Sequence, residues 1–213
     1  MFKNNKSKLL ISSILVILPI FIGLILWNHL PEQIVTHWSF DGTPDGWSSK
    51  TFTVLGLPLI LLAIHLVCLF ITFLDPKNEM QAKTVFNLVI WITPVISLYA
   101  NGTIYLATFD INVPIQIFAP IFTGFILIII GIYLPKCKQN YTIGIKLPWT
   151  LNDEANWNNT HKFASKFWIL GGILMTACGF LPENICILAF FAIILIITLI
   201  PSIYSYMYYT KHK

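Results

Sequence analysis

Six long apolar stretches constrain this chain more than any other feature of its sequence. A helix that crosses the hydrocarbon core of a membrane needs about 20 mostly apolar residues, because its backbone polar groups can bond only within the helix. The stretches cover residues 9–27, 51–74, 84–107, 115–134, 164–181 and 185–206. They predict an all-α fold, a polytopic membrane bundle of about six transmembrane helices.

The composition fits a chain that is solvated mainly by lipid. Hydrophobic residues make up 56% of the 213 residues and charged residues only 10%, whereas about a quarter of the residues in a soluble domain are charged. All thirteen basic residues are lysines, and the net charge is +4. Most of the lysines lie between or beside the apolar stretches, as is typical of the cytoplasmic loops of a membrane protein. We therefore expect the lipid bilayer as a partner and no direct binding of nucleic acid.

The distribution of the lysines predicts the orientation. Loops rich in lysine are retained on the cytoplasmic side of a bacterial membrane. Twelve lysines fall on one side of the predicted spans, which leaves Lys50 alone on the other. This predicts a multi-pass protein of the bacterial cell membrane with both termini in the cytoplasm. A cleaved signal peptide fits the first stretch less well, because the stretch is long and no small-residue cleavage site follows it.

We expect one membrane domain, residues 1–213, because no linker is long enough to separate two folding units. Within it, residues 1–83 form an N-terminal helical pair and residues 84–213 form a four-helix part. Two long connections carry nearly all the specific polar residues. They are the first loop, residues 28–50, on the outer side, and the second loop, residues 135–163, in the cytoplasm.

The first loop contains turn-forming residues that predict a folded segment. Gly42 favours positive φ, Pro44 fixes φ at a turn position, and Asp41 and Asp45 can bond back to nearby backbone. His37 with Asp41 and Asp45 offers an imidazole and two carboxylates, which are side chains that bind zinc or perform acid–base chemistry. Gly42 and Pro44 interrupt any helix that would align the three, so we expect no metal and no other cofactor. The alternatives are a structural cluster, in which the aspartates cap turns and His37 bonds locally, and a partner-binding surface.

The second loop combines turn residues with the start of a helix. Pro148 disfavours helix at Leu147, and Thr150 with Asp153 three residues later resembles a capping box. From there, larger and polar residues recur at helical spacing, namely Trp157, His161, Ala164 and Trp168. This pattern predicts a helix that begins near Thr150 and continues into the fifth span. The ordinary interpretation of the tryptophans is anchoring at the membrane interface.

Few polar side chains fall inside the predicted spans, the clearest being His65, Asn87 and Asn101. An ionisable residue in a membrane is often functional, but a neutral histidine or asparagine also bonds across helices. We expect the second role. The shortage of polar residues at this depth argues against a transporter or channel, because its substrate would need a polar path.

Motifs in the two loops resemble the SdpI family of bacterial membrane immunity proteins. The first loop resembles the small membrane domain of unknown function found in such proteins, with Val35 where proline is usual. The second resembles the family segment Ile-Gly-x-Arg-Thr-Pro-Trp-Thr-Leu, which is followed by Trp and His. The matching residues are Leu30, Pro31, Ile34, His37, Trp38, Gly42, Pro44 and Asp45 in the first loop and Ile143, Gly144, Pro148, Trp149, Thr150, Leu151, Trp157 and His161 in the second. Lys146 and Leu147 replace Arg-Thr, and lysine lacks the planar fork with which arginine binds an anion.

The resemblance covers essentially the whole chain and implies immunity rather than enzymatic activity. Its implied partners are a secreted membrane-active peptide toxin and a cytoplasmic transcriptional repressor that the toxin-occupied protein holds at the membrane. Partner-binding residues are then expected in the second loop at Asn140, Ile143, Gly144, Lys146, Pro148, Trp149, Thr150, Trp157 and His161, and in the first loop at Pro31, His37, Trp38, Gly42, Pro44, Asp45 and Trp47. The alternatives are a small-substrate transporter or channel and a membrane sensor without immunity function.

Overall fold

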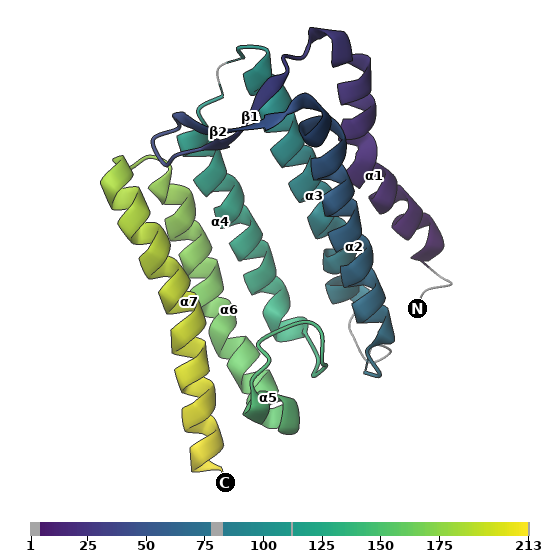
Figure 1. The fold of residues 1–213 in the computed structure, drawn as a ribbon. Helices are drawn as coiled ribbons and strands as arrows, with labels where there is room; N and C mark the ends of the chain where they lie inside the picture. Colours follow the sequence, from purple (N-terminus) through teal and green to yellow (C-terminus); the bar gives the residue numbers. More distant parts are fainter. Residues whose placement is uncertain (1–4, 78–82, 112, 213) are drawn as a thin grey trace. The chain divides into compact units, whose positions relative to one another are not determined.

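A computed structural model describes residues 5–77, 83–111 and 113–212 (Figure 1). These residues are mostly helical, and the chain divides into two compact units. The first unit consists of Met1–Leu74 and Phe86–Ile115, and the second unit consists of Asp75–Val85 and Gln116–Lys213. The third long helix therefore groups mainly with the N-terminal helices, whereas the expected division lay between residues 83 and 84.

Five helices in the described part of the chain are long and apolar enough to cross a membrane. They are Lys6–Ile25, Phe52–Leu74, Lys83–Thr108, Ile115–Lys136 and Glu183–Lys211. Each coincides with one of the six predicted stretches. The remaining stretch, residues 164–181, lies largely in α6 (Glu154–Cys178), which is less apolar than the five because its first half is polar.

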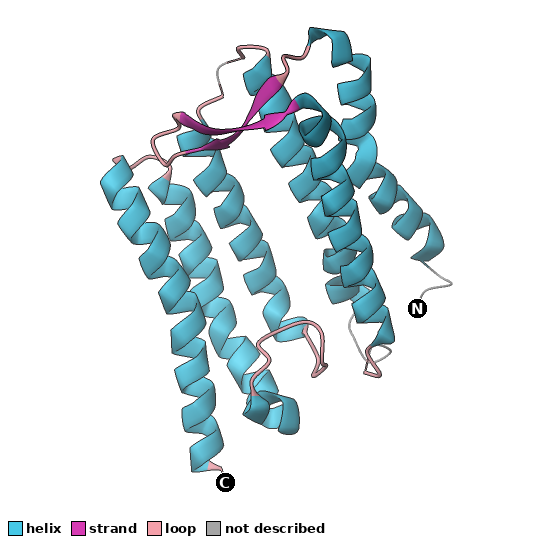
Figure 2. Ribbon diagram, in the orientation of Figure 1, coloured by secondary structure: helices cyan, strands magenta, loops and turns pink. Residues whose placement is uncertain are grey.

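The first unit contains three long helices and a β-hairpin. Its elements in chain order are α1 (Lys6–Ile25), the 3₁₀ turn η2 (Trp27–His29), β1 (Gln33–Trp38), β2 (Pro44–Ser49), the π-helical turn η3 (Phe52–Gly56), α2 (Leu57–Leu74) and α3 (Lys83–Thr108). The hairpin, magenta in Figure 2, is an exception to the all-α class expected from the sequence. It forms because β1 is rich in β-branched and aromatic residues and a glycine turn follows it.

Polar contacts join α1 to α3 along their length. The hydroxyl of Ser97 donates to the carbonyl of Val16 at 2.8 Å, and the hydroxyl of Tyr105 donates to the carbonyl of Pro19 at 2.9 Å. Both side chains are buried. In lipid, where apolar burial supplies little helix–helix attraction, such bonds and close packing hold helices together.

The polar residues predicted inside the spans are used for packing within the first unit. His65 Nε2 lies 3.0 Å from the hydroxyl oxygen of Ser12, and Lys8 Nζ donates to Asn87 Oδ1 at 3.0 Å. Asn101 donates to a backbone carbonyl one turn earlier in its own helix. His65 and Asn87 therefore make contacts between helices, as expected, whereas the side-chain amide of Asn101 donates within α3.

The second unit contains α4 (Ile115–Tyr133), the 3₁₀ turn η5 (Leu134–Lys136), α5 (Pro148–Asn152), α6 (Glu154–Cys178) and α7 (Glu183–Lys211). Glycines allow α4 and α6 to approach closely. A Cβ on Gly172 would lie 2.6 Å from the carbonyl oxygen of Gly124, and Ser165 donates to the carbonyl of Gly131 at 2.7 Å. Contacts through small residues are typical of membrane helix pairs.

A buried polar cluster joins α6 to α7. Asn156 Nδ2 donates to the carbonyl of Ser205 at 3.0 Å, and the Ser205 hydroxyl donates to Asn156 Oδ1 at 2.7 Å. Thr160 also donates to Asn156 Oδ1, at 2.9 Å. All three side chains are buried, so the cluster sets the register of the two helices.

The helix that enters the fifth predicted span begins later than expected. Thr150 does not cap it but lies in the short α5, and the extended backbone of Asp153 separates α5 from α6. The Asp153 carboxylate accepts a hydrogen bond from the backbone N–H of Ala155 at 2.8 Å and thus caps α6. Aspartate is the stronger N-cap here because its carboxylate suits the positive end of the helix.

Candidate functional site in the second loop

The first loop folds as a hairpin with a self-contained turn. Asp41 Oδ1 accepts hydrogen bonds from the hydroxyl and the backbone N–H of Thr43 and from the hydroxyl of Ser39. These bonds, those from Thr43 first, hold the pKa of Asp41 below its ordinary value. Gly42 has φ +86°, as the tight turn requires. Asp41 is therefore a turn cap, as one of the interpretations of the sequence expected.

His37 and Asp45 form an exposed pair on the hairpin. The imidazole Nδ1 lies 2.5 Å from Asp45 Oδ1, and their side chains are 73% and 44% exposed. The strand pairing explains this, because His37 lies opposite Gly46, the residue after Asp45. The structure brings together two of the three candidate ligands, while Asp41 faces its own turn. Within the described residues, no group of three or more histidine, cysteine, aspartate or glutamate side chains is arranged to hold a metal ion.

Part of the first loop packs onto the helices and part of it is exposed. Leu30 and Ile34 are buried against residues of η3 and α3 within the first unit. Pro31, Pro44 and Trp47 are exposed. The exposed residues are the part of the hairpin that remains accessible to a partner.

The second loop is built around Asn140, whose buried side chain forms hydrogen bonds through both its amide oxygen and its amide nitrogen. Oδ1 accepts hydrogen bonds from the backbone N–H groups of Thr142 at 2.8 Å and Ile143 at 2.6 Å. Nδ2 donates to the carbonyls of Lys138 and Ile143, each at 2.8 Å. An asparagine that satisfies four backbone groups fixes the shape of the turn from residue 138 to residue 143.

Asp75, which directly follows α2, holds the same turn from outside. Its buried carboxylate accepts hydrogen bonds from the backbone N–H of Tyr141 at 2.7 Å, the hydroxyl of Thr142 at 3.1 Å and the backbone N–H of Lys77 at 2.9 Å. Lys77 Nζ donates to Gln139 Oε1 at 2.5 Å and lies 5.3 Å from the centre of the Tyr141 ring. The sequence Asp-Pro-Lys at residues 75–77 indicates that a helix ends there, because proline is incompatible with a helix interior. It does not indicate that Asp75 bonds to the second loop.

His161 and Trp157 of α6 form the floor of the loop. His161 Nδ1 donates to the carbonyl of Trp157 at 2.8 Å, so Nε2 is free to accept the backbone N–H of Ile145 at 2.9 Å. The two rings stack with centroids 4.1 Å apart, and Trp157 Nε1 donates to the carbonyl of Cys137 at 2.8 Å. Trp157 is 0% exposed and is the largest fully buried side chain of the described chain.

Gly144 lies directly against the side chains of Trp157 and His161. Its φ is +120°, and a Cβ there would lie 2.5 Å from His161 Nε2 and 2.9 Å from the Trp157 ring. Only glycine combines this backbone conformation with this small volume. Gly144, Trp157 and His161 therefore form one structural unit.

Thr150 and Gln139 fix the short helix α5 to the rest of the loop. The backbone N–H of Leu147 donates to Thr150 Oγ1 at 2.9 Å, and the Thr150 hydroxyl donates to the carbonyl of Ile145 at 2.9 Å. Gln139 Nε2 donates to the carbonyls of Thr150 and Leu151 at 2.9 and 3.0 Å. Gln139, like Asp75, was missed from the sequence, and one of its partners, Lys77, is 62 residues away along the chain.

The remaining predicted residues form the accessible face of the loop. Lys146 and Pro148 are exposed, and Trp149 is half-buried against α7. The Trp149 ring lies 5.3 Å from the Tyr206 ring and 6.2 Å from the Tyr209 ring, measured between centroids. We name Lys146, Pro148 and Trp149 the outer face of the second loop. The buried residues shape the loop, and the outer face is what a partner can contact.

Burial makes the loop sensitive to acid through His161. It lowers the pKa of His161 from 6.5 to about 4, although the bond to the Trp157 carbonyl acts in the opposite direction. As the pH falls, His161 is therefore protonated in the unfolded chain before it is protonated in the folded protein. The contribution of neutral His161 to the unfolding free energy is present above pH 6.5 and decreases as the pH drops toward 4. At pH 5.5 we expect a loss of about 1.4 kcal/mol of unfolding free energy relative to neutral pH.

Thermal unfolding of the purified protein in detergent, followed by tryptophan fluorescence from pH 7.5 to pH 4.5, measures this loss. His161→Gln retains an acceptor but cannot titrate, so the difference between the two proteins isolates His161. A difference that does not change with pH contradicts the prediction.

Both loops fall in regions of the chain that are similar to known protein families. Residues 136–205, which include the second loop, match the profile of the SdpI/YfhL protein family. Residues 14–62, which include the hairpin, match a domain of unknown function, DUF1648. The chain is 29% identical over 206 residues to the immunity protein SdpI of Bacillus subtilis (strain 168), covering 96% of this chain and 97% of that protein. No solved structure matches at a significant level. The chain thus carries an SdpI/YfhL family region at residues 136–205 and a DUF1648 region at residues 14–62, and it is a distant homologue of the immunity protein SdpI.

Proposed function

We propose that this chain is a membrane immunity protein that protects the cell producing it from a secreted, membrane-active peptide toxin. The observation that carries the proposal is its likeness to the immunity protein SdpI along the whole length of both chains. The folded second loop supports it, because the residues shared with the family motif either build the loop or form its outer face. None of this requires a chemical reaction, and we propose no enzymatic activity.

The proposed topology has six crossings with both termini in the cytoplasm. The sixth crossing is supplied by α6, whose apolar second half continues from a polar first half at the inner membrane surface. Twelve lysines then lie on the cytoplasmic side and Lys50 on the outer side. Three crossings separate the hairpin from the second loop, so this topology places the hairpin outside and the second loop inside.

The proposed mechanism assigns one partner to each side. The toxin contacts the exposed residues of the hairpin, among them Trp47, and a cytoplasmic repressor binds the outer face of the second loop. A toxin that binds two arrangements of the protein with different affinity shifts their populations and can thereby change the second loop. Lys146 offers the repressor one positive charge rather than the bidentate fork of arginine.

A toxin challenge tests immunity directly. A sensitive strain that lacks its own immunity gene is transformed with the intact protein, and survival is measured after addition of purified toxin. The intact protein is expected to restore survival. Loss of the Trp47 side chain, in Trp47→Ala, should weaken toxin binding about tenfold or more if this tryptophan is a central contact. Absence of protection by an intact protein that reaches the membrane contradicts the proposed immunity.

The signalling part needs a separate readout. A transcriptional reporter of the repressor, measured in the same cells, should respond to toxin with the intact protein and lose its response with Trp149→Ala. Trp149→Phe keeps an aromatic ring against Tyr206 and Tyr209 and should retain most of the response. A reporter response without protection would instead indicate a sensor that has no immunity function.

A further inference from the structure

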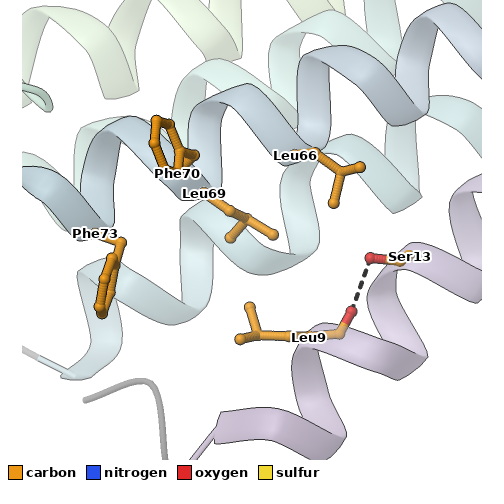
Figure 3. Close-up of a pocket in the computed structure, with 6 residues that line it drawn as sticks. All are labelled: Leu9, Ser13, Leu66, Leu69, Phe70 and Phe73. Atoms are coloured by element: carbon orange, nitrogen blue, oxygen red, sulfur yellow. Dashed lines mark hydrogen bonds between the residues drawn. The ribbon is translucent and has the colours of Figure 1, made fainter.

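An apolar groove lies between α1 and α2 in the first unit. It has a volume of about 390 Å³ and is lined by Leu9 and Ser13 of α1 and by Leu66, Leu69, Phe70 and Phe73 of α2. Figure 3 shows the aliphatic side chains of the two helices directed into the space between them. The Ser13 hydroxyl donates to the carbonyl of Leu9 at 2.9 Å, so even the one polar residue of the lining bonds to its own helix.

The dimensions and chemistry of the groove suit a hydrocarbon chain. Residues 66–73 cover about 10 Å of helix, which is a fraction of a hydrocarbon core about 30 Å thick. Leu66, Phe70 and Phe73 remain substantially exposed at its rim, so the groove opens to the side of the helix pair that lipid would cover. A segment of one acyl chain can fill it without leaving a polar group unpaired.

The mouth of the groove carries positive charge. Lys6, Leu9 and Ser13 are spaced as residues i, i+3 and i+7, which places them on one face of α1. Lys6 is exposed one turn before Leu9, and helical side chains lean toward the N-terminus, away from the groove and toward the headgroups. Lys8 is two residues from Lys6 and therefore lies on another face of α1, where its Nζ donates to Asn87 Oδ1 of α3 at 3.0 Å. Lys6 is thus the lysine on the groove side of the helix.

We propose that the groove is a binding site for an anionic phospholipid, with an acyl chain between α1 and α2 and the phosphate held by Lys6. The apolar lining selects a lipid rather than a free phosphate, and the exposed ammonium of Lys6 selects an anionic lipid rather than a zwitterionic one. The inference rests on the membrane location of the chain and does not depend on immunity.

Native mass spectrometry of the purified protein, with dioleoyl phosphatidylglycerol and dioleoyl phosphatidylcholine added in turn, tests the proposal. The two lipids have identical acyl chains and differ in headgroup charge. Phosphatidylglycerol is expected to bind more tightly, and Lys6→Gln should reduce this preference by about fivefold. Lys211→Gln, at the C-terminal end of α7, is the matched charge control and should leave the preference unchanged.

Leu66→Trp tests the groove itself, because it adds bulk at the partly exposed rim rather than in the packed core. It should weaken binding of both lipids, while Leu195→Trp on an exposed face of α7 should not. The proposal is overturned if the two lipids bind equally well or if Leu66→Trp binds them as tightly as the intact protein does. It is also overturned if inorganic phosphate, added alone, binds as tightly as phosphatidylglycerol. These measurements use no toxin, so failure here leaves the immunity proposal standing, and the reverse also holds.

Discussion

Replacement of Gly144 by alanine is expected to lower the unfolding free energy by about 3 kcal/mol or more. The new Cβ would impose φ +120° on an L-residue and would lie 2.5 Å from His161 Nε2 and 2.9 Å from the Trp157 ring. His161 would have to move, and the backbone N–H of Ile145 would then lose the acceptor that it now has at 2.9 Å. Thermal unfolding in detergent measures the loss of stability.

Gly102→Ala is the matched control for this substitution. Gly102 lies in α3, and a Cβ there meets nothing within 4 Å. Alanine should leave stability unchanged or raise it by up to about 1 kcal/mol, because alanine is the better helix former. If Gly144→Ala is as stable as the intact protein, the second loop does not have the close packing described above. In the toxin challenge, the stable control should protect cells and Gly144→Ala should protect them less.

Replacement of Asp75 by alanine is expected to cost about 3 kcal/mol. Three donors lose their acceptor, namely the backbone N–H groups of Lys77 and Tyr141 and the hydroxyl of Thr142. Because Asp75 is buried, water replaces these bonds poorly, and the turn that Asn140 organises loses its outer support. Hydrogen exchange followed by mass spectrometry should show faster exchange of the peptides that contain Tyr141 and Thr142.

Two variants separate the contact from a general effect of charge. Asp75→Asn keeps one acceptor oxygen and should fall between the intact protein and Asp75→Ala. Asp153→Ala removes a partly exposed carboxylate that accepts one backbone N–H at 2.8 Å, and it should cost about 1 kcal/mol. Equal losses for Asp75→Ala and Asp153→Ala would show that the buried contacts of Asp75 contribute little.

Much of the candidate site could be found from the sequence because its residues lie close together along the chain. Gly144, Thr150, Trp157 and His161 fall within one short segment, and the family motif marks them. The sequence did not show that Trp157 and His161 are buried while Lys146 is exposed. That division follows from which face of α6 packs beneath the loop, and an interfacial helix with tryptophans and lysines is compatible with either arrangement.

The residues that were missed have partners far away in the sequence. Asp75 bonds to Tyr141, and Asn156 bonds to Ser205. A single aspartate after an apolar stretch, or a single asparagine in a helix, is equally consistent with a solvent-exposed residue. Only the folded chain shows that each is buried beside its partner.

The long helices could be identified from the residue order alone, since a chain in lipid must satisfy its backbone within each helix and the length of an apolar run is then the length of a crossing. The same reasoning does not extend to the first loop, where strand pairing between β1 and β2 replaced the turn-rich segment expected, or to the second loop, where Asp75 and Gln139 complete the structure. Apolar length is a local property of the chain. Hydrogen bonding in a loop depends on which distant groups reach it, and the three-dimensional packing of the helices sets that choice.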